Sequence, residues 1–268
     1  MKRLVLSTTA AGLLALAMSG SALAADLGER IEGLKPAVDG VNGKISAGWQ
    51  YFGVPGVGSI NLAYLDASLS VPVGQRFGVQ LDAAGVVRSG FWLGGVGVHA
   101  FWRDPDKGLA GVYGDVVGAT FLGATKVWRL GFEGEAYMGK FSIEAFAGIQ
   151  GATNGAPNIF TGDLTAAFYP TENIRLSAGI ARNFAVVFGK AGLEVAIPRG
   201  STVLPALFVD SEFNADFRAV RAGFRLYFGG SDKSLMRRHR EDDPRNRIGS
   251  YPGYHINAPE EDVEESTT

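Results

Sequence analysis

Charged side chains that could bind ions or perform acid–base chemistry recur in this sequence inside otherwise apolar runs. In residues 127–137, VWRLGFEGEAY, Arg129, Glu133 and Glu135 share one set of alternate positions, and large apolar residues fill the other set. Carboxylates on a common face can work as an acid–base pair, but arginines on that same face favour ion pairing instead. Ten positions follow this pattern and are our candidates for one interior face: Asp82, Arg129, Glu133, Glu135, Glu144, Asp163, Arg175, Glu194, Arg221 and Arg225.

Nucleophilic and metal chemistry have little support in the sequence. Of the three histidines, only His99 lies in an apolar run, and that run offers it no acid or nucleophile as a partner. The chain has no cysteine, so it has neither a thiolate nucleophile nor a zinc–thiolate site. The glycine pattern GGVGVHAF is not followed by the helix that a phosphate-binding loop needs. We therefore predict no catalytic residue, no metal and no cofactor.

The runs that carry these charges have the period of β-strands. Between Gly43 and Phe228 about twelve runs show apolar residues at every second place, separated by Gly, Pro, Asn and Asp. This spacing predicts an all-β fold: a transmembrane antiparallel up-and-down β-barrel of about 12 strands, with 10 to 14 open. The charged face would line the lumen. Aromatic residues near run ends, such as Trp102 and Tyr169, favour membrane girdles, although a soluble barrel or sandwich also alternates.

The connections between the runs fall into two sets. Even-numbered connections such as RDPDKG and YPTEN are polar turns, whereas odd-numbered ones such as FGVPGVG and FAVVFG are small and often apolar. An up-and-down barrel with two different ends would show this alternation. An even strand number places both chain ends on one side, which we expect to be the periplasm.

The two ends of the chain differ from the periodic region. Residues 1–24 read as a signal peptide, with Lys2 and Arg3 before an apolar stretch and cleavage expected after Ala24. Residues 25–42 are expected to form an N-terminal periplasmic arm. Residues 229–268 have 6 basic and 9 acidic residues, and the interleaved charges of MRRHREDDPRNR predict a solvated, periplasmic and partly disordered tail. The formal net charge of −2 argues against nucleic acid as a partner.

The last periodic run resembles the terminal strand of bacterial outer-membrane barrels. It is VRAGFRLYF, in which the aromatic Phe228 follows apolar residues at alternate places, although 40 residues come after it. The resemblance implies recognition by the barrel-assembly machinery, with Phe224, Leu226 and Phe228 as the assembly signal. Residues 224–244 also resemble uncharacterised outer-membrane barrels of alphaproteobacteria, which implies a location in the cell outer membrane and no particular activity.

These observations predict a non-enzymatic barrel in outer-membrane lipid, with a structural role or a role in passive diffusion of small solutes. Acids and bases on one face predict a narrow or charge-paired lumen, and hence small, weakly selective conductance. A selective porin, a barrel enzyme acting on lipid or peptide, and a soluble periplasmic ligand-binding barrel remain as alternatives. The sequence leaves the oligomeric state open.

Overall fold

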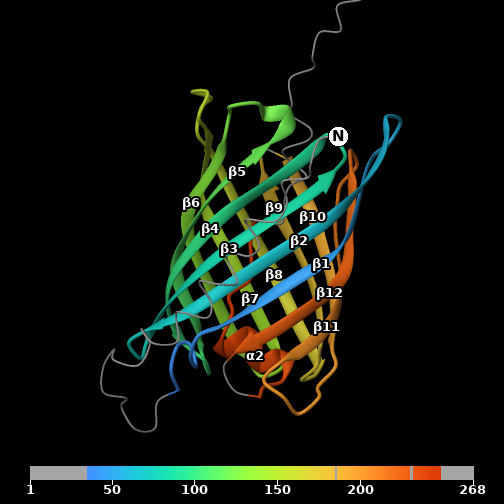
Figure 1. Cartoon of the computed structure of the whole chain (residues 1–268). Helices are drawn as coiled ribbons and strands as arrows, with labels where there is room; N and C mark the ends of the chain where they lie inside the picture. Colours follow the sequence, from blue (N-terminus) through green and yellow to red (C-terminus); the bar gives the residue numbers. More distant parts are fainter. Residues whose placement is uncertain (1–34, 185, 230–231, 249–268) are drawn as a thin grey trace, which may run out of the picture.

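The computed structural model describes residues 35–184, 186–229 and 232–248, whose strands close into one antiparallel barrel (Figure 1). Each strand pairs with the next along the chain, and β12 pairs with β1 to close the sheet. This confirms the predicted up-and-down barrel of twelve strands. The strands are β1 (Asn42–Val54), β2 (Gly58–Val73), β3 (Phe77–Arg88), β4 (Phe91–Asp104), β5 (Gly108–Ala119), β6 (Val127–Met138), β7 (Phe141–Ala152), β8 (Ile159–Thr171), β9 (Ile174–Asn183), β10 (Val186–Ala196), β11 (Leu204–Phe213) and β12 (Arg218–Gly229).

Side chains alternate between the lumen and the outer surface along each strand, as the pleat of a β-strand requires. In β3, Gln80 and Asp82 are buried inside the barrel, whereas Leu81 between them is exposed on the outside. The outward set is strongly apolar: the exposed fraction is 74% for Phe132 and 70% for Phe224. The barrel is therefore polar inside and apolar outside, the opposite of a soluble sandwich with an apolar core.

Glycine allows the wall to pack closely where β6 and β7 meet. Gly131 pairs with Gly148, and a Cβ atom on either residue would collide with a backbone carbonyl of the facing strand. A larger residue at either place would push the two strands apart. Glycine at these two positions therefore allows the two strands to approach closely.

The start of β1 and the end of β12 lie at the same end of the barrel, because Asn42 pairs with Gly229. One expected boundary is wrong. Residues 184–189 were expected to form a connection, but Val186 already pairs with Asn183 and belongs to β10. The chain turns at Phe184, whose φ is 49°. The β-branched residues that follow favour continued pairing over a longer loop.

Residues 35–41 lie against that same barrel end. The Ala37 amide donates a hydrogen bond to Gln75 O over 2.8 Å, and the Arg103 guanidinium donates to Ala37 O over 3.2 Å. Val38 packs in an apolar cluster with Phe101 and another residue of the wall. The predicted signal peptide and the first part of the predicted N-terminal arm fall outside the described residues.

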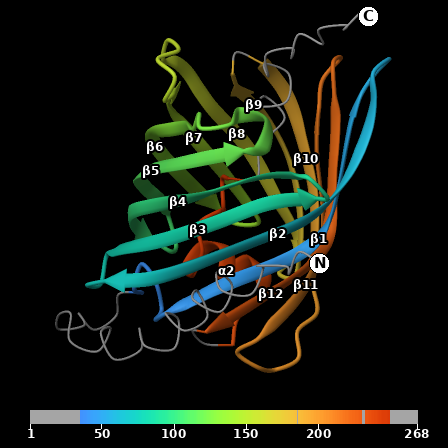
Figure 2. The ribbon, with the colours of Figure 1, turned by 45° about the horizontal axis from the view of Figure 1, so that its top comes forward.

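A short helix, α2 (Leu235–Glu241), lies within the barrel at this end (Figures 1 and 2). None of the helices among the described residues has the length and apolar character to cross a membrane. The helix opens a stretch of chain that continues through the lumen. We call residues 233–248 the lumen segment.

Candidate functional site: a charged lumen and the segment inside it

The ten charged residues singled out from the sequence all come from the inward face of the wall. Seven are buried, and the other three (Glu135, Asp163 and Arg225) are partly buried and contact lumenal groups. By contrast, Phe224 and Leu226 of the predicted assembly signal point outward, and Phe228 is half-buried. The alternation in the sequence had therefore separated charged interior positions from apolar exterior ones, without showing which charges meet.

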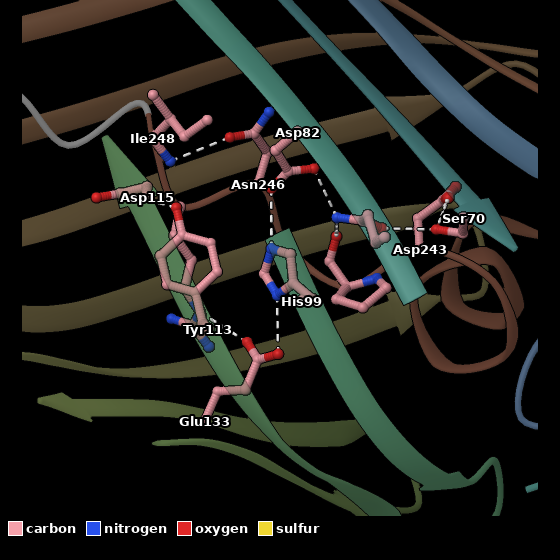
Figure 3. A network of polar contacts seen from close by, with 12 residues as sticks. Ser70, Asp82, His99, Tyr113, Asp115, Glu133, Asp243, Asn246 and Ile248 are labelled. Atoms are coloured by element: carbon pink, nitrogen blue, oxygen red, sulfur yellow. Dashed lines mark hydrogen bonds and ion pairs between the residues drawn. The ribbon is translucent and has the colours of Figure 1, made fainter. Parts of the chain in front are cut away.

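His99 lies at the centre of a buried acid–histidine–acid contact (Figure 3). Its Nε2 atom is 2.9 Å from Asp82 Oδ2 on the adjacent strand β3, and its Nδ1 atom is 2.8 Å from Glu133 Oε1 on β6. All three side chains are almost completely buried. The ring of Tyr113 packs beside the imidazole, with 4.4 Å between ring centroids. The residues around His99 in the sequence do not indicate these partners, because both acids lie in other strands.

The contacts of His99 have the geometry of an ion-pair centre and do not resemble those of a hydrolytic site. In a catalytic triad one imidazole nitrogen is oriented by an acid and the other faces a hydroxyl nucleophile. Here both nitrogens of His99 face carboxylates, and two ionised acids are satisfied together only when both ring nitrogens carry a hydrogen. His99 therefore fits an ion-pair centre that joins β3, β4 and β6.

The wall also contains arginine–carboxylate pairs that need nothing from outside the strands. Arg129 contacts Asp115 through two guanidinium nitrogens, one of them Nε at 3.0 Å, which gives the pair a fork geometry. Such pairing compensates for the cost of burying the charges. Three further pairs have N–O distances of 2.7, 3.5 and 2.8 Å: Arg175 with Glu144, Arg221 with Glu212, and Arg225 with Glu194.

The lumen segment begins with α2, which is fastened to the barrel end by polar contacts. His239 on this helix lies between two wall tyrosines, with Nδ1 2.9 Å from the Tyr169 hydroxyl and Nε2 2.7 Å from that of Tyr227. The expectation that Tyr169 belongs to an outer aromatic girdle is therefore wrong, because its side chain is buried and faces the lumen. Burial, together with the positive charges of Arg175 and Lys44, lowers the pKa of His239 well below its usual range. The neutral ring then donates one hydrogen bond and accepts the other.

The C-cap residue of α2 is a buried aspartate, Asp242. Asp242 accepts a hydrogen bond from Lys233 Nζ at 2.6 Å and another from Arg238 at 3.2 Å. Burial, with a further contribution from the neighbouring Asp243, raises the pKa of Asp242 to about 6 despite these two cations. Burial also raises the pKa of Asp243, whose carboxylate accepts a hydrogen bond from Ser70 on β2 at 2.9 Å.

The chain then crosses the lumen in an irregular conformation, held by side chains of the wall. The carbonyl of Pro244 accepts hydrogen bonds from Lys44 on β1 at 2.8 Å and from Gln80 on β3 at 3.0 Å. Asn246 donates its side-chain amide to backbone carbonyls of β2 and β3, at Ala67 and Ala83. Figure 3 shows Asn246 and Asp243 beside the His99 centre.

Arg247 bridges the opposite wall. Its guanidinium donates to Glu133 and Asp163, each at 3.0 Å, and to the carbonyl of Ala145 at 3.1 Å. Its own carbonyl accepts a hydrogen bond from Arg129 at 2.8 Å. One residue thus joins β6, β7 and β8, and it shares Glu133 with His99.

The last described residue, Ile248, is completely buried in the largest apolar cluster of the lumen. Leu93 and Val117 of this cluster lie beside the β3–β4 and β5–β6 connections, at the end opposite to α2. The lumen segment therefore runs from one end of the barrel toward the other.

These contacts correct one prediction from the sequence. Residues 232–248 were expected to belong to a solvated tail, yet Arg238, Asp242, Asp243 and Arg247 are buried within the barrel. The interleaved charges that suggested solvation find partners on the wall and within the segment itself. The lumen segment contains functional candidates that the sequence reasoning missed, foremost Arg245 and Arg247.

A polar cavity of about 70 Å³ remains between α2 and the wall and is partly open to solvent. Tyrosines, arginines and carboxylates line it, so both signs of charge are present. Glu144 illustrates the pattern: it pairs with Arg175 at 2.7 Å and has Arg245 of the lumen segment 3.7 Å away. Among the described residues no group of three His, Asp or Glu side chains is placed to hold a metal ion.

The strand pairing and the two faces define the class of this protein: a closed twelve-stranded antiparallel β-barrel with a charged lumen and an apolar outer surface. No protein-family model matches the chain, and no curated protein matches it in sequence.

Several solved bacterial outer-membrane barrels are similar in fold. The KdgM porin, solved with a disordered oligogalacturonate, is 9% identical, with a TM-score of 0.49 over 69% of this chain and 99% of that one. The translocator domain of the autotransporter NalP from Neisseria meningitidis is 10% identical, with a TM-score of 0.47 over 82% and 96%. Outer membrane phospholipase A from Escherichia coli is 16% identical, with a TM-score of 0.46 over 77% and 97%.

Proposed function

We propose that this protein is an exported bacterial outer-membrane barrel with a structural role or a role in slow passive diffusion of small solutes. The apolar outer surface supports the membrane location. Leu130, Phe132 and Phe224 are more than half exposed near the middle of their strands, where water would be a poor solvent for them and lipid a good one. A soluble periplasmic ligand-binding barrel would need polar residues at these places.

The route to the membrane is part of the same proposal. Residues 1–24 would direct export, and the outward side chains of β12 would present the assembly signal to the barrel-assembly machinery. The start of β1 at Asn42 and the end of β12 at Gly229 would then face the periplasm, on the side of α2. The resemblance of residues 224–244 to barrels of alphaproteobacteria agrees with this location.

The observation that carries the functional proposal is the occupied lumen. The lumen segment crosses the barrel, and the wall charges nearby are paired with one another or with the segment. A solute has only the space that these side chains leave, so we expect small conductance. A selective porin with a wide open filter at Glu133 and Glu135 is less well supported, because Glu133 binds both His99 and Arg247.

Membrane fractionation followed by planar-bilayer recording tests the proposal. We expect the full-length protein in the outer-membrane fraction, extracted only by detergent, and small conductance from the purified protein. Recovery in the soluble periplasmic fraction would contradict the membrane location. Large and steady openings of the unmodified protein would instead favour the open selective porin.

The enzyme alternative can be tested at His99. Because both ring nitrogens are engaged by carboxylates, we expect no lipid, ester or peptide hydrolysis that depends on this residue. The purified protein and the His99→Ala variant should behave alike in a substrate screen. Activity present in the parent and lost in a correctly assembled variant would contradict the non-enzymatic proposal.

A further inference from the structure

The wall and the lumen segment have opposite net charge. With histidine counted as neutral, the segment carries six basic and three acidic residues, a net charge of +3. The buried and partly buried inward positions of the strands carry ten acidic and seven basic residues, a net charge of −3: Asp66, Asp82, Asp115, Glu133, Glu135, Glu144, Asp163, Glu194, Asp210 and Glu212 against Lys44, Arg103, Arg129, Arg175, Lys190, Arg221 and Arg225. The segment thus neutralises a lumen that is acidic without it.

The acids that the segment contacts do not depend on it for pairing. Glu133 keeps His99 at 2.8 Å, and Glu144 keeps Arg175 at 2.7 Å. Asp163, the other acid that binds Arg247, has Lys190 at 3.6 Å. Removal of the segment would therefore leave each of these carboxylates with a partner in the wall. This avoids the large cost of an unpaired buried charge and makes a second state of the lumen accessible.

The contacts of the segment are of a kind that water can replace. Most are hydrogen bonds or ion pairs to wall side chains, and its fully buried apolar anchors are Leu235 and Ile248. Lysine, arginine and glutamine side chains of the wall would be hydrated in a water-filled lumen. The barrel itself is closed by backbone hydrogen bonds between strands, in which the segment takes no part.

We propose that the lumen segment is a displaceable plug, latched by Arg247, over a pathway that selects small cations. This inference rests on the proposed diffusion role. It adds the class of solute and the way in which the pathway is opened and closed. With the plug in place the lumen is electrically balanced and obstructed. With the plug displaced, the excess of wall carboxylates favours cations over anions.

A reversible cross-link tests displacement in a single protein. The chain has no native cysteine, and the side chains of Ser70 and Asp243 meet at 2.9 Å between the wall and the segment. A Ser70→Cys, Asp243→Cys variant should conduct little when oxidised and recover its openings when a reductant is added to the same bilayer. The single Ser70→Cys variant should be unaffected by reductant.

Removal of the latch gives the opposite signal. We expect Arg247→Ala to raise the open probability about tenfold or more, because charge-assisted hydrogen bonds to two carboxylates are lost. The matched control is Arg237→Ala, which removes the same charge from an exposed position that pairs with Glu241 on the same helix. Methylguanidinium should block the Arg247→Ala channel by occupying the vacated site, while leaving the wild type and the control unchanged.

The outcomes separate this inference from the proposed function. In a salt gradient, the reversal potential of the Arg247→Ala channel should lie close to the equilibrium potential of the cation. Equal currents from the oxidised and reduced cross-linked forms would overturn the plug but leave passive diffusion standing. Anion-selective or unselective openings would overturn the cation pathway. An absence of current from every inserted variant would overturn the diffusion role and the plug together.

Discussion

The barrel wall and the lumen segment satisfy their polar groups in different ways. Backbone groups of the wall pair in continuous ladders from β1 round to β12, so each strand depends on its two neighbours. In the segment beyond α2, the carbonyls of Pro244 and Arg247 instead accept hydrogen bonds from wall side chains. A ladder opens cooperatively, whereas side-chain contacts can be exchanged for water one at a time. The comparison indicates that the barrel wall is more stable than the lumen segment inside it.

The same difference applies to the charges. The pair of Arg129 and Asp115 joins adjacent strands, and Asp115 has no second basic partner at salt-bridge distance in the described part of the chain. Each acid bound by Arg247 has one. Loss of a cation should therefore be costly in the wall and mild in the segment.

The largest effect that we predict follows from this contrast. Arg129→Ala should lower the free energy of unfolding by about 3–5 kcal/mol, because Asp115 is left buried without its cation and keeps only the neutral hydrogen bond from the Tyr113 hydroxyl among its described side-chain contacts. Arg247→Ala should cost less than half of that, because both of its acids keep a wall partner. The free energy of unfolding of both variants can be measured by urea unfolding of the refolded barrels, monitored by heat-modifiable gel migration. Equal losses would contradict the distinction between wall and segment.

A second prediction concerns the outer face of the wall. Phe224→Arg should cost about 2–4 kcal/mol, since it places a charge in lipid near the middle of β12. Phe224→Leu keeps an apolar side chain there and serves as the control, with a much smaller effect expected. Refolding yield into lipid vesicles and the urea midpoint both report the change. Tolerance of arginine equal to that of leucine would contradict a lipid-facing position.

The sequence predicted the wall far better than the segment, for a physical reason. Alternation along a strand is a local signal, so positions such as Gln80, Leu81 and Asp82 reveal their faces from their immediate neighbours. Arg247 has no such signal: its two carboxylate partners are 114 and 84 residues earlier in the chain. A polar stretch without periodicity has the same composition whether its partners are water or a charged lumen.

Pairing within the lumen was also beyond local reasoning. His99 had no acid in its own run, but strand register places Asp82 on the adjacent strand and Glu133 two strands away within reach. The sequence did indicate that acids and bases share one face, which is why ion pairing was expected. Which acid meets which base depends on the tilt and register of a closed sheet, and these emerge only from the whole fold.

The smallest effect that we predict is a pH dependence at α2 with two opposing parts. The pKa of Asp242 is about 6 in the docked segment against an ordinary value of 3.8, so the docked form binds a proton more tightly, and docking weakens as pH rises from about 4 to about 6. For His239 the docked pKa is lowered, so docking weakens as pH falls below its ordinary value of 6.5. Asp243 acts in the same direction as Asp242, because burial raises its pKa as well, and the side chains of Lys233 and Arg238 donate hydrogen bonds to Asp242.

Single substitutions should separate these two parts. Release of the segment can be followed as the modification rate of a Ser70→Cys background by a neutral thiol reagent, with variants compared at each pH so that titration of the thiol itself cancels. Relative to this background, His239→Gln should make release increase from pH 4 to 6, because the aspartates then dominate. Asp242→Asn should make release increase toward low pH, because His239 then dominates. Parallel pH profiles for the two variants would show that neither group is linked to docking, and the comparison between wall and segment would then rest on the ion pairs alone.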